Sequence, residues 1–206
     1  MTEQPLQRYR LIGISGKIGS GKTSLARDLQ SRQTSLEKHS FADKLRDVLC
    51  CVSGIAPSET RSAEQKNAVP AYWDKSVGTL LQDIGESMRQ GVHADTWVLA
   101  LFSRWSDDQR WVIDDVRHVN EADGIRARGG LLIRLNGDPS GERAGSTRNL
   151  EHPSETALDN YPHFDVIIDT ERYVDQWDEM FEEIGRQVRE KLDQEEAYRI
   201  MISGNY

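Results

Sequence analysis

The 206-residue sequence contains few cysteines, no long hydrophobic run and no surplus of positive charge. Its two cysteines, Cys50 and Cys51, are adjacent, so they cannot join distant segments by a disulfide, and they favour a reducing compartment. No stretch approaches the roughly 20 apolar residues of a membrane-spanning helix. The polar start, MTEQPLQRYR, lacks the apolar core of a secretion signal. We therefore expect a cytoplasmic protein with no membrane partner.

The formal net charge of −8 argues against broad electrostatic attraction to nucleic acid or to anionic membranes. The basic residues between 126 and 134 form only a small group flanked by acids, so we expect no nucleic-acid partner. A small anionic ligand remains compatible with this charge, because local arginines and backbone N–H groups decide binding at a pocket. The length fits one domain, residues 1–206, with one core.

Short apolar segments alternate with helical patterns along the chain. We predict strands at residues 10–15, 36–41, 110–114, 131–135 and 164–169. We predict helices at residues 22–31, 42–52, 77–90 and 95–105, and a long closing helix whose apolar stripe is Val174, Trp177, Phe181, Ile184, Val188 and Leu192. Residues 53–76 read as irregular, with a short helix near Glu64. This alternation predicts an α/β fold with a central parallel sheet flanked by helices.

A further helix is expected after the third strand. Asn120 and Asp123 have the spacing of a capping box at its start, and Gly129 and Gly130 mark its end.

A glycine-rich turn follows the first predicted strand and opens the first predicted helix. The segment GKIGSGKT fits the phosphate-loop pattern G-x-x-x-x-G-K-[ST]. Its glycines let backbone N–H groups converge on phosphate oxygens at a helix N-terminus. We expect Lys22 to reach the β- and γ-phosphates of ATP and Thr23 to bind Mg²⁺. The predicted ATP-binding residues are Gly16, Lys17, Gly19, Ser20, Gly21, Lys22, Thr23 and Ser24.

The stretch WVIDDVR places Asp114, Asp115 and Arg117 at the end of a strand. Ligands of open α/β sheets bind at this edge. One aspartate is expected to hold a water of Mg²⁺ near Thr23, and Arg117 to hold a substrate phosphate. The alternative interpretation is a capped strand end with a solvated salt bridge.

Two other polar segments are candidates for binding a second substrate. Residues 136–152 form a long polar segment with Arg143 and Arg148, which suits a lid that closes over a transferring phosphoryl group, the alternative being an ordinary surface loop. On the helix at 77–90, Gln82, Glu86 and Arg89 lie on one face at i, i+4 and i+7. Taken alone, this strip also fits a solvated helix face.

Six segments together resemble a known family. In order between Leu11 and Trp177, they read GKIGSGKTS, FADKLR, VGTLLQDIGESMRQGVHADTWV, VIDDVRHVNEADGIRARGG, HPSETALD and FDVIID. This series is similar to the deoxynucleoside monophosphate kinases of bacteriophages. The resemblance implies a P-loop kinase fold and transfer of the γ-phosphoryl group of ATP to a deoxynucleoside 5′-monophosphate with Mg²⁺. It also implies a helical acceptor-binding region at about residues 42–105 and a lid at about 136–152.

The resemblance assigns roles to residues that match the family's motifs. It implies that the catalytic residues are Lys22, Asp115, Arg117, Arg143 and Arg148, with Asp115 joining Thr23 near Mg²⁺. It implies that the acceptor-binding residues are Phe41, Lys44, Arg46, Gln82, Arg89, Trp97, Arg117 and Glu155. His152 and Ser154 match a segment to which we assign no role. Gly78 stands where some relatives carry arginine, which leaves the base preference open.

Other functions remain as alternatives. Phosphomevalonate kinases share parts of the pattern, so the acceptor could be phosphomevalonate, dephospho-coenzyme A or another small phosphorylated molecule. A non-kinase P-loop ATPase or GTPase is the second alternative, although the chain has no N/T-K-x-D motif for guanine recognition. The expected partners are small-molecule nucleotides, and a homodimer is compatible with the resemblance.

Overall fold

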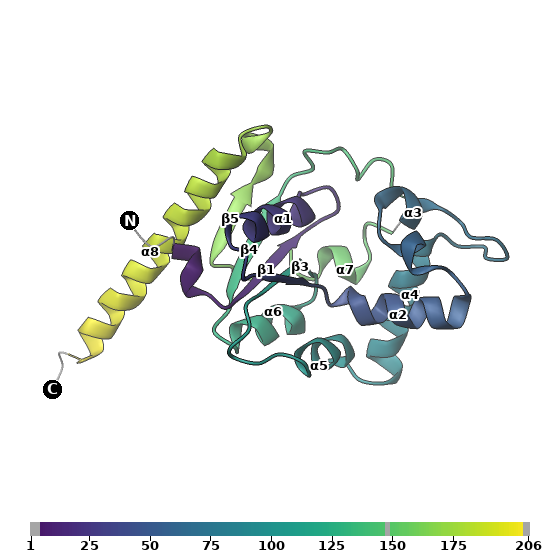
Figure 1. Ribbon diagram of the computed structural model, residues 1–206, viewed down its shortest axis with the longest axis horizontal. Helices are drawn as coiled ribbons and strands as arrows, with labels where there is room; N and C mark the ends of the chain where they lie inside the picture. The colour runs from purple at the N-terminus through teal and green to yellow at the C-terminus, as the bar shows by residue number, and fades with distance from the viewer. Residues whose placement is uncertain (1–4, 147–148, 204–206) are drawn as a thin grey trace.

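The computed structural model describes residues 5–146 and 149–203 and has a central sheet of parallel strands (Figure 1). The strand order is β2-β3-β1-β4-β5, and all four pairings are parallel. The strands are β1 (Leu11–Gly16), β2 (Glu37–His39), β3 (Trp111–Val116), β4 (Leu131–Asn136) and β5 (Val166–Asp169). The predicted α/β fold with a central parallel sheet is therefore confirmed.

Helices connect the strands and close the chain. They are α1 (Lys22–Arg32), α2 (Ala42–Ser53), α3 (Ala63–Asn67), α4 (Val77–Gly91), α5 (Thr96–Phe102), α6 (Val119–Arg126), α7 (Pro153–Thr156) and α8 (Trp177–Ser203). Three 3₁₀ turns add η1 (Pro5–Arg8), η2 (Pro57–Thr60) and η3 (Thr170–Tyr173). The segment 53–76, expected to be irregular with a short helix near Glu64, contains that helix as α3 and also contains η2. Within the described ranges, no helix is both long and apolar enough to cross a bilayer.

Both faces of the sheet are covered, because successive side chains of each strand point to opposite sides. Ile12 and Ile14 of β1 lie in one buried cluster with the apolar faces of α1 and α8. Leu11 lies in a second cluster with α5 and α6. Between them on β1, a Cβ atom at Gly13 would lie 2.5 Å from Ile125 Cδ1, so glycine lets α6 pack directly against the strand.

A third, smaller core belongs to the helices beyond the sheet. Its buried members come from α2, α4 and the turn between them: Leu49, Ile55, Val77, Leu80 and Leu81. Figure 1 shows α2, α3 and α4 together at one end of the molecule and α8 at the other. The segment predicted as an acceptor-binding region therefore has apolar packing of its own.

The closing helix differs from its predicted pattern at both ends. Phe181, Ile184 and Val188 are buried as expected, but Val174 precedes α8 and is 53% exposed, and Trp177 is 40% exposed. At the other end, α8 continues past Leu192 to Ser203 with exposed side chains, and Figure 1 shows this part extending away from the sheet.

The capping box predicted at Asn120 and Asp123 is wrong. Helix α6 begins at Val119, so Asn120 already lies inside it. The carboxylate of Glu121 instead accepts hydrogen bonds from the backbone N–H groups of Arg117 and His118, which precede the helix. The side chain that caps the start of α6 is therefore the buried Glu121, and not Asp123.

Candidate active site

The phosphate loop lies between the end of β1 and the start of α1, as its spacing predicts. A Cβ atom at Gly16 would lie 2.3 Å from Ser20 Oγ and 2.6 Å from Leu135 O, so no side chain fits there. Gly21 is the N-cap of α1 with φ of 87°, a left-handed conformation that glycine adopts without strain. The chain can therefore turn tightly and present its amides at the helix N-terminus, where anions bind.

The predicted lysine of the loop is buried against the loop itself. Lys22 Nζ donates to Lys17 O at 2.5 Å and to Ser20 Oγ at 3.3 Å. The ammonium group thus lies at the phosphate-binding turn. Lys17 points outward instead, and its Nζ pairs with Asp159 at 2.7 Å.

A pocket opens beside the loop, and we name it the loop pocket. It is lined by residues 18–24 and by residues of the lid segment, of the β5–α8 connection and of the first turn of α8: Pro139, Ser140, Glu142, Thr170, Tyr173, Val174, Asp175, Trp177 and Met180, with Leu135, Lys66 and Arg117. The partly exposed Trp177 ring lies near Gly21. An aromatic face at this place can stack on a planar base. The sequence pattern did not predict this position, because Trp177 fits the apolar stripe of the closing helix.

The oxygen atoms of Thr23 and Asp114 meet at the edge of the loop pocket. Thr23 Oγ1 donates to Asp114 Oδ2 at 2.9 Å, and Lys38 Nζ lies 2.8 Å from the same oxygen. A hydroxyl and a carboxylate suit Mg²⁺, which takes oxygen ligands and usually one or two from protein, the rest being water and substrate phosphates. No cluster of three or more histidine, cysteine or acidic side chains with metal-site geometry occurs in residues 5–146 and 149–203. The donor set present therefore fits Mg²⁺ rather than a metal held by the protein alone.

Asp115, the expected partner of Thr23, lies in a different place. Its carboxylate accepts hydrogen bonds from Ser40 Oγ at 2.5 Å, Phe41 N at 2.8 Å and Ala42 N at 2.9 Å, and so fixes the start of α2. Burial and the neighbouring Asp114 raise the pKa of Asp115. Asp114, and not Asp115, is therefore the carboxylate that lies next to Thr23.

A second pocket lies between the helical region and the ends of the strands, and we name it the helical pocket. Its lining includes six of the predicted acceptor-binding residues: Phe41, Arg46, Gln82, Arg89, Trp97 and Arg117. Trp97 is fixed there by a hydrogen bond from its Nε1 to Gly85 O at 3.1 Å. Lys44 is not among the described residues that line it, because its side chain is 47% exposed and pairs with Asp47.

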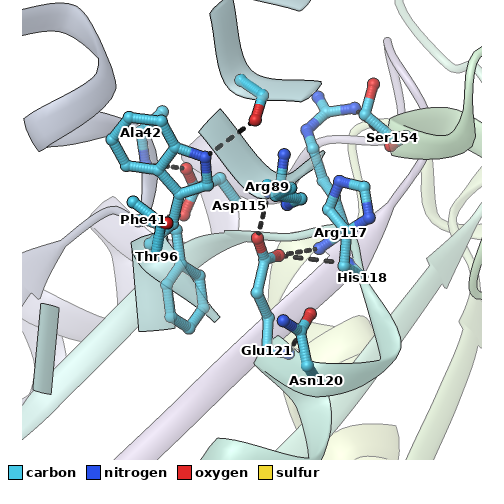
Figure 2. A network of polar contacts seen from close by, with 12 residues as sticks. Phe41, Ala42, Arg89, Thr96, Asp115, Arg117, His118, Asn120, Glu121 and Ser154 are labelled. Carbon is cyan, nitrogen blue, oxygen red and sulfur yellow. Dashed lines mark hydrogen bonds and ion pairs between the residues drawn. The ribbon is translucent and has the colours of Figure 1, made fainter. Parts of the chain in front are cut away.

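A buried carboxylate organises one wall of the helical pocket (Figure 2). Glu121, with a side chain 2% exposed, accepts from Arg89 Nη2 at 2.8 Å, Arg117 N at 2.8 Å and His118 N at 3.1 Å. Burial raises the pKa of Glu121 to about 7, although Arg89 and the two backbone donors oppose this rise. The only sequence signal for Glu121 was its place three residues after the N-cap.

His118 lies in the same wall and stays neutral at physiological pH. Burial, followed by the charges of Arg89 and Arg117, lowers the pKa of His118 to about 3. Its Nε2 atom is buried without a hydrogen-bond partner among the residues described.

Two cationic side chains line both pockets. Arg117 does so from the end of β3, and its Nη1 donates to Ser154 O at 3.0 Å and to Glu155 Oε1. Lys66 reaches both pockets from α3. The short helix near Glu64 was predicted, but no sequence pattern connected Lys66 on this helix with a ligand site. Positive charge is therefore present where the two pockets meet.

Of the two predicted lid arginines, Arg143 does not line the loop pocket or the helical pocket. Arg143 donates from Nε to Ile18 O at 3.2 Å and from Nη2 to Gly137 O at 2.5 Å, on the outer side of the phosphate loop. There it borders a third pocket with Lys17, Arg134 and Asp159. Arg148 lies outside the described residues.

Other contacts tie the lid segment to the helical region. Asn67 Nδ2 donates to Gly145 O at 3.0 Å, and Gln82 Nε2 donates to Asn149 O at 3.2 Å. The described residues of the lid segment therefore contact both the phosphate loop and the helices that surround the helical pocket.

An all-parallel sheet, a phosphate loop after its first strand and a second pocket facing that loop together define a P-loop kinase fold. No family model matches the chain. The chain is 31% identical over 186 residues to the "Putative deoxynucleotide monophosphate kinase" of Acanthamoeba polyphaga mimivirus, a match that covers 81% of this chain and 91% of that protein. The chain belongs to the deoxynucleotide monophosphate kinase family, and its kinship supports a kinase-type enzyme.

Proposed function

We propose that the protein transfers the γ-phosphoryl group of ATP to a deoxynucleoside 5′-monophosphate and releases a deoxynucleoside diphosphate. The observation that carries this proposal is the meeting of two pockets at Arg117 and Lys66, because phosphoryl transfer requires two anionic ligands end to end. The name of the viral relative supports a deoxynucleotide as the acceptor.

The loop pocket is the proposed site of ATP. Backbone amides of the phosphate loop and Lys22 would hold the phosphates, and Trp177 would stack on the base. Thr23 and Asp114 would hold Mg²⁺, which when bound neutralises charge on the β- and γ-phosphates.

The helical pocket is the proposed site of the acceptor. Apolar side chains including Phe41, Leu45 and Leu81 would pack against its base. Gln82 and Arg89 offer polar groups from the same helix for the edges of the base or for the sugar. Arg117 would bind its phosphate at the end nearer the phosphate loop.

The reaction needs positioning and charge neutralisation more than covalent chemistry. An acceptor phosphate oxygen is already ionised at neutral pH, so no protein group has to remove a proton from it. Arg117 and Lys66 would stabilise the negative charge that develops between donor and acceptor. The lid segment 136–152 would exclude water, which otherwise competes as an acceptor.

The test is formation of ADP from ATP and Mg²⁺ with each deoxynucleoside and ribonucleoside 5′-monophosphate in turn. Dephospho-coenzyme A and phosphomevalonate serve as control acceptors, and Lys22→Ala as the inactive control variant. We expect ADP and the matching deoxynucleoside diphosphate in equal amounts. If ADP forms only with a control acceptor, the protein is still a kinase, but a deoxynucleoside 5′-monophosphate is not its acceptor. ADP at one rate whatever is added would indicate an ATPase.

A further inference from the structure

A single buried carboxylate connects the phosphate loop with Arg117. Glu155 lies in α7, and its side chain is 1% exposed. Its Oε2 accepts from the backbone N–H of Ile18 at 3.2 Å, and its Oε1 accepts from Arg117 Nη1. One side chain therefore holds a donor-site backbone atom and an arginine that reaches both pockets.

The preceding residue holds the same arginine and also contacts the helical region. Ser154 O accepts from Arg117 Nη1 at 3.0 Å, and Figure 2 shows Arg117 reaching toward Ser154. Ser154 Oγ lies 3.5 Å from Gln82 Nε2 and 3.0 Å from His152 Nδ1. Two residues of α7, Ser154 and Glu155, thus accept hydrogen bonds from Nη1 of Arg117.

The remaining donors of Arg117 are directed elsewhere. Within residues 5–146 and 149–203, no acceptor binds Arg117 Nε or Nη2, so these N–H groups remain for anions in the pockets. Glu155 is not among the described residues that line either pocket. It therefore contacts the side of Arg117 that faces away from the ligands, and the sequence-based expectation that it binds the acceptor does not describe its position.

We propose that Glu155 is a positioning residue, which fixes the Arg117 guanidinium and the Ile18 amide relative to each other. This inference rests on the proposed phosphoryl transfer. The distance between donor and acceptor phosphates depends on the phosphate loop on one side and on Arg117 on the other. Because the carboxylate of Glu155 contacts both, it fixes the phosphate loop and Arg117 at one distance from each other. A displacement of about 1 Å at a reaction centre lowers rates by roughly 100-fold.

The substitution Glu155→Gln tests this arrangement with little change in shape. Glutamine has one oxygen in place of two, so it can accept from Ile18 N or from Arg117 but not from both. Its NH₂ group then faces an N–H donor. We expect kcat to fall by about 30- to 100-fold, whereas the KM for ATP rises by only about threefold and the KM for the acceptor changes by less than that.

A double-mutant cycle separates positioning through Arg117 from a general structural role. The four proteins are wild type, Glu155→Gln, Arg117→Ala and the double variant, assayed with the best acceptor of the wild type. If Glu155 acts through Arg117, Glu155→Gln lowers kcat by less than about threefold in the Arg117→Ala background. The same fold-loss in both backgrounds would overturn the inference.

Asp165→Asn supplies a matched structural control. Asp165 also accepts from a backbone N–H, that of Leu132 at 2.8 Å, and also pairs with a cation, Lys191 at 3.4 Å, but it lies outside both pockets. It should lower the unfolding temperature and leave kcat unchanged. A loss of kcat in Asp165→Asn equal to that in Glu155→Gln would count against a positioning role.

A binding measurement keeps the inference testable apart from the proposed function. If the wild type phosphorylates no acceptor, the proposed function fails, and the same cycle is measured on the affinity for a non-hydrolysable ATP analogue. Arg117 lines the loop pocket and Glu155 holds Ile18, so we expect weaker binding in each single variant and no further loss in the double variant. Additive losses, or unchanged affinity in Glu155→Gln, would overturn the inference.

Discussion

Substitution by asparagine should have different effects at the two adjacent aspartates at the end of β3, lowering stability at Asp115 and Mg²⁺ affinity at Asp114. In Asp115→Asn, the new NH₂ group faces at least one of three buried donors, Ser40 Oγ, Phe41 N and Ala42 N. A buried donor left without an acceptor costs about 1–3 kcal/mol. One or two such donors lower the free energy of unfolding by about 2–4 kcal/mol, which for a chain of this size is about 5–15 °C in Tm.

Asp114→Asn should instead affect the metal. The amide oxygen of asparagine can still accept from Thr23 Oγ1, so we expect a loss of stability below about 1 kcal/mol. The negative charge next to the proposed Mg²⁺ site disappears, and loss of such a group typically lowers metal affinity or activity by about 10- to 100-fold. The Mg²⁺ concentration for half-maximal activity should rise accordingly.

The assay combines a Mg²⁺ titration of ADP formation with thermal unfolding of both variants. We expect a raised Mg²⁺ requirement for Asp114→Asn and a lowered Tm for Asp115→Asn. A raised Mg²⁺ requirement with an unchanged Tm in Asp115→Asn would refute this assignment, because the carboxylate of Asp115 would then act at the metal, as the sequence alone suggested.

Three further substitutions test other parts of the site. Trp177→Ala should raise the KM for ATP by about tenfold through lost stacking, with the acceptor KM unchanged in initial-rate assays. Lys66→Met should lower kcat by about 100-fold, whereas Arg199→Met, which removes the same charge from the exposed end of α8, should have no effect. The raised pKa of Glu121 means that the folded protein keeps a proton that the unfolded chain releases between about pH 4.5 and 7. The free energy of unfolding of the wild type should therefore fall by up to about 3 kcal/mol relative to that of Glu121→Gln as the pH rises through this window, measured by denaturant unfolding. A difference that is constant with pH would contradict the raised pKa; the comparison also cancels the opposite contribution of His118, whose lowered pKa makes stability fall as the pH drops below about 6.5.

The parts of the site that local spacing determines could be predicted from the sequence. A phosphate loop needs glycines, a lysine and a threonine at fixed separations between a strand and a helix, and the structure contains that arrangement at β1 and α1. The pocket walls at Phe41, Gln82 and Trp97 followed from the family resemblance. The structure places all three side chains in the lining of the helical pocket, while their roles stay predictions.

The choice between Asp114 and Asp115 could not be made locally. Neighbouring strand residues point to opposite sides, so the register of β3 against β1 decides which carboxylate meets Thr23. That register shifts between Gly13 and Ser15, next to the phosphate loop. Lys66 was not predicted, and Glu155 was predicted to bind the acceptor rather than to pair with Arg117, for a related reason: their contacts are with residues far away in the sequence.

Two arginines of the proposed site each pair with a buried carboxylate on one side and reach a pocket on the other. The arginine charge that an anionic ligand can contact is therefore on the pocket side in each pair. Arg89 pairs with Glu121 and Arg117 with Glu155, and in both pairs the carboxylate is 1–2% exposed whereas the arginine is 17–21% exposed.

This asymmetry determines how arginine substitutions must be interpreted. Removing the arginine alone leaves the carboxyl group buried without its cation, which destabilises a protein by about 3–5 kcal/mol where that group is ionised, for Glu121 above its pKa of about 7. The activity lost in Arg89→Ala would therefore combine weaker acceptor binding with lower stability. In Arg89→Ala/Glu121→Gln the buried charge is gone as well, so recovery of Tm without recovery of the acceptor KM would isolate the contribution of Arg89 to binding. Recovery of both would show that Arg89 serves mainly to neutralise Glu121.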